Sequence, residues 1–371
     1  MRIAFDGKRA VQNFTGLGNY SRFVLELLAQ HFPENEYFVY AQKSLPPGLA
    51  QLNKIELRQP PPKKFNALWR SYGIVKDLKR DKISLYHGLS NELPFGITSA
   101  KIPSVVTIHD LIFLRFPEFY PFIDRVIYKY KFKFACENAS RIIAVSEQTK
   151  EDIINYFGIS EDKIDVVYQG CNKIFQEPSS DELKRKISRK YKLPKQYLLQ
   201  VGTIERRKNL LLTVKALKNI PRTVKLVVIG KDTAYLKEVK ALITQYKLDR
   251  RVIFLKNVPL EDLPPIYQQA QIFIYPSEFE GFGIPIIEAL HSGIPVIAAI
   301  GSCLEEAGGP HSSYIHPQDD IQLSWSVNSI LNNPDLGRNM VEKGFEYVKK
   351  FNTNQLAENL MNTYQKVLNH A

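Results

Sequence analysis

Strand-like and helix-like segments alternate along almost the whole chain, and this alternation predicts an α/β protein built on parallel sheets. Short runs rich in branched and aromatic residues give the expected strands, which are 2–6, 37–41, 85–87, 104–109, 141–146 and 164–168 in the first half and 197–202, 225–230, 252–255, 272–275 and 295–299 in the second. Helical spacing of apolar residues is found in 20–30, 148–157, 209–217, 234–246 and 264–270.

The length of the chain favours two domains, because 371 residues are many for a single core and enough for two. The polar stretch 177–195 separates the two series of strands, and we interpret it as a linker that contains a short helix. We therefore expect an N-terminal domain in residues 1–176 and a C-terminal domain in 196–353, both Rossmann-like. A cleft between two such domains is a preferred place for a ligand.

The charge and the cysteine content narrow the class of protein. Basic residues exceed acidic ones by 12, which permits attraction to nucleic acid, anionic lipid or a phosphate-bearing substrate. The three cysteines are too far apart for a zinc motif and too few for a disulfide framework. The N-terminus lacks the apolar core of a signal peptide, and no apolar run reaches the roughly 18 residues of a membrane span. We expect a cytoplasmic protein.

Residues 277–293, SEFEGFGIPIIEALHSG, form the most informative segment for function. A strand precedes it, Pro285 suits the start of a helix, Gly293 suits the stop, and a strand follows. This order places backbone amides and a helix N-terminus at the carboxyl edge of a parallel sheet, where anionic ligands bind. We expect Glu280 in the loop to accept hydrogen bonds from sugar hydroxyls, and Glu288 in the first helical turn to hold a ribose.

A basic loop follows the first strand of the C-terminal domain, where residues 201–210 read VGTIERRKNL. A strand runs into Gly202 and Thr203, and the cations Arg207 and Lys208 then precede a helix. Positive side chains at such a turn suit a diphosphate, whose negative charge must be neutralised when its bond to a sugar breaks. The alternative is an ordinary solvated basic loop.

Together these motifs resemble the retaining glycosyltransferases of family 4, whose signature is a pair of glutamates with seven residues between them. The resemblance implies the GT-B fold, with two Rossmann-like domains whose parallel sheets face a deep cleft and a final helix, 354–371, that packs back on the first domain. It implies sugar transfer from a nucleotide to an acceptor hydroxyl with retained configuration and without metal or cofactor. Many members place an arginine where this chain has Thr203, so Arg207 would have to compensate.

The same resemblance suggests the substrates. The GTIExRKN loop favours mannose from GDP-mannose, although a UDP-sugar is possible. The acceptor would be a glycan or a lipid-linked acceptor in the synthesis of polysaccharide, lipopolysaccharide or glycolipid. The proposed catalytic residues are Glu280, His109, Lys208 and Arg207. The proposed donor-binding residues are Gly16, Gly18, Gly202, Thr203, Val258, Gly281, Phe282, Gly283, Ile284 and Glu288, and no metal ligand is expected.

Three further features belong to the expected N-terminal domain. The loop FTGLGNY at 14–20 carries Gly16 and Gly18, which allow close approach of backbone to a ligand. His109 ends an apolar strand, and the resemblance puts it near the donor sugar, while a structural histidine held by Asp110 is the alternative. The turn at 86–94 offers candidate acceptor contacts, which are His87, Asn91 and Glu92.

A basic segment at 54–82 combines many cations with apolar residues at helical spacing, among them Phe65, Leu68, Trp69, Tyr72 and Val75. Such a helix could lie on an anionic membrane, where Lys63, Lys64, Arg70 and Lys79 would meet headgroups, and the protein would then be peripheral on the inner face of the cell membrane. A helix that packs against the core is the alternative.

Two other functions fit parts of the sequence. A nucleotide-sugar 2-epimerase would have the same architecture, but the two glutamates argue against it. A nucleic-acid-binding protein is suggested by the positive charge, yet the cations are dispersed and no binding module is recognisable, so we expect no nucleic-acid partner.

Overall fold

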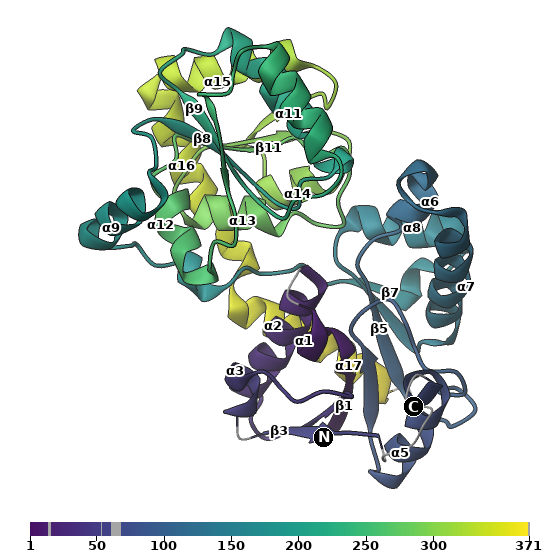
Figure 1. Ribbon diagram of the computed structural model, residues 1–371. Helices are drawn as coiled ribbons and strands as arrows, with labels where there is room; N and C mark the ends of the chain where they lie inside the picture. Colours follow the sequence, from purple (N-terminus) through teal and green to yellow (C-terminus); the bar gives the residue numbers. More distant parts are fainter. Residues whose placement is uncertain (14–15, 53, 61–67, 370–371) are drawn as a thin grey trace. The chain divides into compact units, whose positions relative to one another are not determined.

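The computed structural model describes residues 1–13, 16–52, 54–60 and 68–369. The chain divides into two compact units, of which unit 1 comprises Met1–Gln169 and Phe351–Ala371, and unit 2 comprises Gly170–Lys350 (Figure 1). The chain thus leaves the first unit once, completes the second, and returns to the first with its last helix.

Unit 1 is built on a parallel sheet in which the strands lie in the order β3-β2-β1-β4-β5-β6-β7. The strands are β1 (Arg2–Asp6), β2 (Glu36–Tyr40), β3 (Ile55–Arg58), β4 (Leu85–Gly88), β5 (Ser104–Ile108), β6 (Arg141–Ala144) and β7 (Ile164–Val166). The helices are α1 (Lys8–Gln12), α2 (Gly16–His31), α3 (Pro47–Ala50), the π-helical turn η1 (Trp69–Gly73), α5 (Ile74–Arg80), α6 (Ile112–Arg115), α7 (Phe122–Asn138), α8 (Glu147–Phe157) and α17 (Thr353–Asn369).

Both faces of this sheet are buried, because successive side chains of a strand point to opposite sides. Ile3 and Phe5 of β1 pack with α1, α2 and α17, whereas Ala4 packs on the other face with α5, α7 and α8. Figure 1 shows the yellow α17 among the purple and blue elements of unit 1, and its Tyr364 is completely buried there. The last helix is therefore part of the core of unit 1.

Unit 2 contains a parallel sheet with strand order β10-β9-β8-β11-β12-β13. The strands are β8 (Tyr197–Val201), β9 (Lys225–Ile229), β10 (Val252–Leu255), β11 (Ile272–Tyr275), β12 (Val296–Ala299) and β13 (Ser313–Ile315). The helices are α9 (Asp181–Tyr191), α10 (Leu210–Ala216), α11 (Leu236–Gln245), α12 (Leu263–Tyr267), α13 (Ile284–His291), α14 (Leu304–Gly308), α15 (Asp320–Asn332) and α16 (Pro334–Val348).

The two sheets share one plan, and both are Rossmann-like as expected. Each begins at a central strand, runs outward to one edge, and then returns to add strands on the other side. The direction reverses between β1 and β4 in unit 1 and between β8 and β11 in unit 2. Ligands of such sheets bind beyond the carboxyl ends of the strands at the point of reversal. The loops after β8 and β11 are therefore expected to form a ligand site.

The boundary between the units differs from the expected linker. Segment 177–195 belongs to unit 2, where α9 packs against α12. Ser188 Oγ donates to Gln269 Oε1 at 2.7 Å, and Tyr191 Oη donates to Asp262 Oδ2 at 2.6 Å. The segment is polar because most of α9 faces solvent, not because it is an unattached connection. The chain changes unit at 169/170 and again at 350/351.

Candidate functional site

The basic loop after β8 takes its shape from residues with positive φ at each end. Gly202 directly after the strand has φ +144°, which side chains rarely tolerate, and Asn209 has φ +54° between the short turn η5 (Arg206–Lys208) and α10. Asn209 Nδ2 donates to the carbonyls of Pro276 (3.2 Å) and Pro317 (2.6 Å), and Gln200 Nε2 donates to Lys208 O at 2.9 Å. The backbone that carries the cations is therefore fixed against the loop after β11.

Lys208, Arg207 and Glu280 form one cluster at the reversal point of the unit 2 sheet. Lys208 Nζ lies 2.5 Å and Arg207 Nη1 lies 2.7 Å from Glu280 Oε1. Lys208 Nζ also donates to the hydroxyl of Tyr275 at 2.6 Å, and Arg207 Nη2 pairs with Glu205 Oε1 at 2.7 Å. The motif after β8 and the motif after β11, predicted separately from the sequence, thus meet in space.

The cluster keeps its carboxylate ionised. Burial alone would raise the pKa of Glu280, but the charges and hydrogen bonds of Lys208 and Arg207 outweigh it and lower the pKa to about 2. Burial lowers the pKa of Lys208, and the neighbouring Arg207 acts in the same direction, while Glu280 opposes both. The charges of Lys208 and Arg207 are balanced by two carboxylates, those of Glu280 and Glu205, so the two cations are held in place by ion pairs before any ligand binds.

Glu288 occupies a different environment from Glu280. Its Oε2 accepts a hydrogen bond from Tyr267 Oη at 2.9 Å, and it lies in the second turn of α13, one turn later than expected. Burial raises the pKa of Glu288 to about 7, only partly offset by the Tyr267 hydrogen bond. The two glutamates of the motif therefore differ in protonation behaviour.

An aromatic row connects the environments of the two glutamates. Tyr267 stacks on Phe273 with centroids 5.3 Å apart, and Phe273 stacks on Tyr275 with centroids 5.8 Å apart. The hydroxyl at one end of the row, that of Tyr267, binds Glu288, and the hydroxyl at the other end, that of Tyr275, binds the Lys208 of the Glu280 cluster. The three stacked rings thus connect the hydroxyl that binds Glu288 with the hydroxyl that binds Lys208.

The remaining donor-binding candidates of unit 2 lie in loops around this cluster or near it in sequence. Thr203 follows Gly202 in the loop after β8, and Val258 is half-buried in the loop after β10. Gly281 is partly exposed next to Glu280, whereas Phe282 and Gly283 are buried, and Ile284 begins α13. The contacts of Lys208, Arg207 and Asn209 described above join the loop after β8, which carries Thr203, to the loop after β11, which carries Gly281.

His109 lies in unit 1, at the carboxyl end of β5, and its ring is engaged by unit 1 itself. Its Nε2 donates to Leu89 O at 2.9 Å, and Gln169 Nε2 donates to its Nδ1 at 3.2 Å. Burial lowers the pKa of His109 to about 4, so the ring is neutral at physiological pH. Asp110 has another partner, since its Oδ1 accepts from Ile112 N. The ring is held by Leu89 and Gln169 rather than by Asp110.

The predicted glycine loop of unit 1 is partly helical. Phe14 and Thr15 lie outside the described residues, whereas Gly16 and Gly18 belong to the first turn of α2. A Cβ on Gly18 would lie 1.8 Å from the carbonyl oxygen of Asn13, so the glycine is required where the end of α1 meets α2. Gly18 has a packing role that explains it without a ligand.

The acceptor candidates of unit 1 have structural partners. His87 is fully buried between the hydroxyls of Tyr364 (2.6 Å) and Thr107 (2.8 Å), which leaves it no surface for an acceptor. Asn91 accepts from the backbone N–H of His109 at 2.8 Å. The proposal for His87 is therefore corrected, and this histidine links α17 to the sheet.

In the described part of the basic segment 54–82, residues 54–60 and 68–82, the helical turns η1 and α5 pack against the core of unit 1 through Trp69, Ile74 and Leu78. Residues Lys63, Lys64 and Phe65 lie outside the described residues. Trp69 is buried and donates to Asp77 at 2.7 Å, and Arg70 pairs with Asp6 (2.5 Å) and Glu92 (2.6 Å). Ile55–Arg58 form the edge strand β3. Arg70 and Trp69 are thus committed to the interior of unit 1.

Sequence reasoning missed three side chains that shape the site, which are Tyr275, Tyr267 and Cys303. The position of Tyr275 as the last residue of a strand at the reversal point was a usable signal. Among the described residues, no group of three or more histidine, cysteine or acidic side chains could hold a metal ion. In the same part of the chain, no helix is long and apolar enough to cross a membrane.

Comparison with known proteins identifies both halves of the chain. Residues 22–173 match the family model described as Glycosyltransferase Family 4, and residues 180–347 match the model described as Glycosyl transferases group 1. The chain is a glycosyltransferase with the GT-B fold. The site at the reversal point of unit 2 thus lies within the group 1 domain.

Sequence relatives of this glycosyltransferase include two named mannosyltransferases. O-antigen chain mannosyltransferase B of Escherichia coli is 29% identical over 294 residues, which cover 78% of this chain and 76% of the relative. O-antigen chain mannosyltransferase RfbU of Salmonella typhimurium is 27% identical over 259 residues, which cover 68% and 69%.

Solved structures share the fold at low sequence identity. HepE of Anabaena, in complex with UDP and glucose, has a TM-score of 0.78 at 18% identity, with 98% of this chain and 99% of that chain covered. Sucrose-phosphate synthase of Thermosynechococcus elongatus has a TM-score of 0.80 at 21% identity, with 100% and 99% covered. Likeness at this level establishes the architecture of the glycosyltransferase.

Proposed function

We propose that this glycosyltransferase belongs to family 4, transfers mannose from GDP-mannose to an acceptor hydroxyl with retained configuration, and acts in the synthesis of a surface polysaccharide such as the O-antigen of lipopolysaccharide. The names of the two relatives support the sugar and the pathway. The spacing of Glu280 and Glu288 and the convergence of the two motifs support the reaction class. A cytoplasmic location is part of the proposal.

The cluster of Lys208, Arg207 and Glu280 is the observation that carries the proposal. When the bond between the anomeric carbon and the diphosphate breaks, negative charge develops on the leaving oxygen. Lys208 and Arg207 are already held by Tyr275, Glu205 and Glu280, so they need not reorganise to stabilise this charge. The acceptor oxygen then forms its bond on the same face of the sugar, and its proton passes to a diphosphate oxygen.

The two glutamates divide the donor between them in this proposal. Both cations bind Oε1 of Glu280, and Oε2 would accept a hydrogen bond from a sugar hydroxyl. Glu288 would accept hydrogen bonds from the ribose, at the other end of the aromatic row. His109 is proposed as a contact to the donor sugar on the family resemblance alone, because its ring nitrogens have partners within unit 1.

Charge neutralisation by side chains makes the reaction independent of metal in this proposal, because arginine and lysine replace the cation that would otherwise bind a diphosphate. With EDTA present, activity should fall by less than about half. Complete loss that Mn²⁺ or Mg²⁺ restores would refute metal independence, while leaving the transfer reaction itself in place.

A panel of nucleotides tests the donor. GDP, GDP-mannose, UDP and UDP-glucose should be compared by thermal shift, because a ligand that binds the native state stabilises it by mass action. We expect GDP-mannose to give the largest shift and to be consumed only when a glycan acceptor is present. A larger shift with UDP-glucose would overturn the choice of donor, and epimerisation of GDP-mannose without acceptor would replace the transferase by a 2-epimerase.

A further inference from the structure

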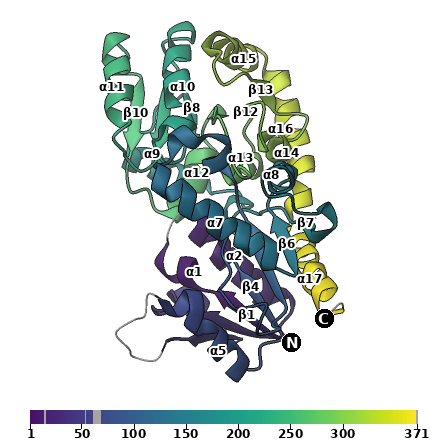
Figure 2. The ribbon, with the colours of Figure 1, turned by 90° about the vertical axis from the view of Figure 1, so that its right-hand side faces the viewer.

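The outward face of α7 in unit 1 is apolar, which is the reverse of what a surface helix normally shows. Phe122 is 72% exposed, Ile123 is 70% exposed and Tyr130 is 64% exposed, and Val126 and Ile127 of the same face are exposed too. The opposite side of α7 packs into the core through Phe132 and Ala135. Figure 2 shows α7 in front of the sheet of unit 1, on its outer side.

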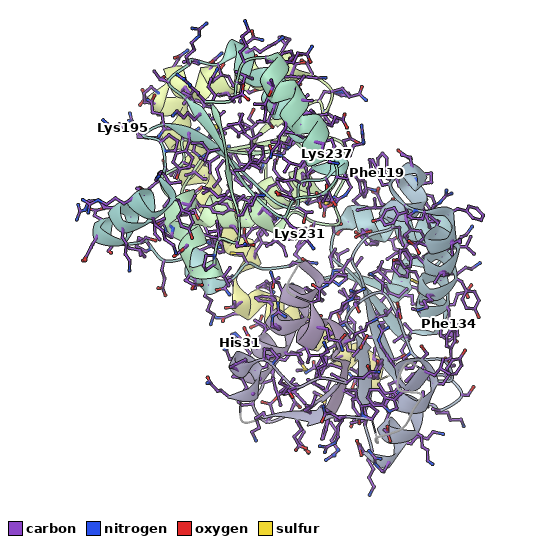
Figure 3. The ribbon with its side chains drawn as sticks, viewed as in Figure 1. His31, Phe119, Phe134, Lys195, Lys231 and Lys237 are labelled. Atoms are coloured by element: carbon purple, nitrogen blue, oxygen red, sulfur yellow. The ribbon has the colours of Figure 1, made fainter. Side chains whose placement is uncertain are left out.

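The apolar face continues beyond α7 onto a neighbouring segment. Tyr72, which is 59% exposed on η1, stacks on Phe95 with centroids 5.0 Å apart. Phe95 in turn contacts Phe134 of α7 (4.6 Å), which is labelled in Figure 3, and Tyr130 (6.2 Å). We call this surface the α7 patch, made of Phe122, Ile123, Val126, Ile127, Tyr130, Phe95 and Tyr72. A continuous patch of large apolar side chains on two elements indicates a contact surface.

Cations flank this patch. Lys129 and Lys133 are exposed and lie on the same side of α7 as Phe122 and Val126, because they follow them at intervals of three, seven or eleven residues. Lys133 is 3.6 Å from Glu137 of the same helix, and Lys129 has no acidic side chain in ion-pairing distance within the described parts of the chain. The helix carries four basic side chains and two acidic ones, in a chain of net charge +12.

We propose that the α7 patch docks unit 1 on the surface of an anionic lipid bilayer. Phe122, Ile123 and Val126 would enter the boundary between headgroups and acyl chains, and Lys129 and Lys133 would meet the anionic headgroups. The tyrosines have an apolar ring and a polar hydroxyl, which suits the level of the headgroups.

The charges favour a bilayer over a second copy of the chain as the occupant of this surface. A twofold dimer brings the same patch of both subunits together. Such a dimer would gather Lys129 and Lys133 of both copies at one contact, and like charges gathered at a contact oppose association. An anionic bilayer satisfies the apolar side chains and the lysines together. This docking surface lies mainly on α7, and of its residues only Tyr72 belongs to the segment 54–82 that the sequence had suggested.

Vesicle co-sedimentation of the full chain tests the proposal. The two probes are vesicles of phosphatidylcholine alone and vesicles in which about a third of the lipid is phosphatidylglycerol. The bound fraction should rise with the anionic lipid and fall as NaCl is raised from about 50 to about 500 mM, because salt screens the headgroup charges. Phe122→Ser with Ile123→Ser should weaken binding about tenfold or more, because two exposed apolar anchors are lost.

The chain offers matched controls on unit 2. Ile321 (62% exposed) and Trp325 (70% exposed) of α15 are as exposed as the α7 anchors, so Ile321→Ser with Trp325→Ser should leave vesicle binding unchanged. Lys129→Glu with Lys133→Glu should abolish the response to phosphatidylglycerol. Lys237→Glu with Lys240→Glu on α11 makes the same change of charge and should preserve the response; Figure 3 labels Lys237.

Three results would overturn the proposal. They are no binding of the wild type to anionic vesicles at low salt, equal losses in the α7 and α15 variants, and a wild-type dimer that Phe122→Ser with Ile123→Ser separates. Nucleotide binding by the same variants is the separate readout for the site of unit 2. Nucleotide affinity should be unchanged in these variants. The docking proposal can therefore fail while the proposed sugar transfer stands, and the proposed sugar transfer can fail while the docking proposal stands.

Discussion

The thiol of Cys303 lies 3.0 Å from the backbone carbonyl oxygen of Glu280. The same sulfur lies 3.1 Å from the carbonyl oxygen of Phe282, so it anchors both sides of Gly281. Cys303 stands between β12 and α14, and the loop that carries the carboxylate is therefore fixed by the next loop along the sheet. Glu280 is thus contacted at its backbone by Cys303 and at its carboxylate by two cations.

Replacing Cys303 should lower activity beyond its effect on stability. Cys303→Ala removes a weak donor from a buried loop, and we expect a loss of about 1 kcal/mol in the free energy of unfolding with a several-fold fall in kcat/KM. Cys136→Ala is the matched control, because Cys136 is also fully buried but lies in the core of unit 1. Urea unfolding and initial rates measure the two effects. Equal kcat/KM for the two variants would show that the anchor does not position Glu280.

Lys208 should be the cation on which turnover depends most. Lys208→Ala removes a preorganised charge that binds Glu280 and Tyr275, and turnover should fall about a hundredfold or more, as for other lost transition-state donors. Lys208→Met keeps the length of the side chain and should lose as much. The neighbouring Arg206 pairs with the exposed Glu238, so Arg206→Ala should have little effect. An unchanged kcat/KM for Lys208→Ala would remove the assignment of a phosphate-binding role.

The two glutamates should separate by function. Glu288→Gln should weaken binding of free GDP, because the nucleotide loses its ribose contact. Glu280→Gln should leave GDP binding nearly unchanged and reduce transfer of the sugar, since in the proposed function its carboxylate binds a sugar hydroxyl. Calorimetry with GDP and with GDP-mannose measures both steps. If both variants lost the same affinity for GDP, the division of roles would be wrong.

The half-buried carboxyl of Glu288 should make the protein less stable at higher pH. Its pKa is raised to about 7 in the folded state from 4.5, so between these values the folded protein holds a proton that the unfolded chain has lost. Stability therefore falls as pH rises through this window, by at most about 3 kcal/mol. Glu288→Gln should remove the dependence, so its advantage over the wild type should grow from pH 4.5 to 7 in urea unfolding. A constant difference across this range would contradict the prediction.

The sequence was sufficient for the interior strands and for two edge strands, β7 and β10, and insufficient for the other two edge strands. The interior strands β1 and β11 have the predicted bounds, because buried parallel strands are continuous runs of branched and aromatic residues, and the edge strand β10, VIFL, was predicted for the same reason. The edge strands β3 and β13 were missed, since β13 has three residues and β3, IELR, is half polar. Helix α7 was missed as well, because apolar residues around its whole circumference leave no helical periodicity to detect.

The sequence predicted the two motifs that form the site, but it did not predict the contacts between their side chains. Local spacing indicated Glu280 and Lys208 because each follows a strand of the same sheet. Lys208 reaches the carboxylate of Glu280 because β8 and β11 are neighbours in the sheet. The order of the strands cannot be predicted from local sequence patterns. His87 was misjudged for the same reason, since its partner Tyr364 is 277 positions away in the sequence.

The buried contact between His87 and Tyr364 has a consequence for biosynthesis. Tyr364, Leu360 and Val367 of α17 complete a face of the unit 1 core, yet they leave the ribosome only after the whole of unit 2 has been translated. Unit 2 is a continuous stretch and can fold as it emerges. Unit 1 cannot complete its core until α17 has been synthesised, because α17 covers one face of its sheet. The unit that is synthesised first is therefore the last to complete its fold.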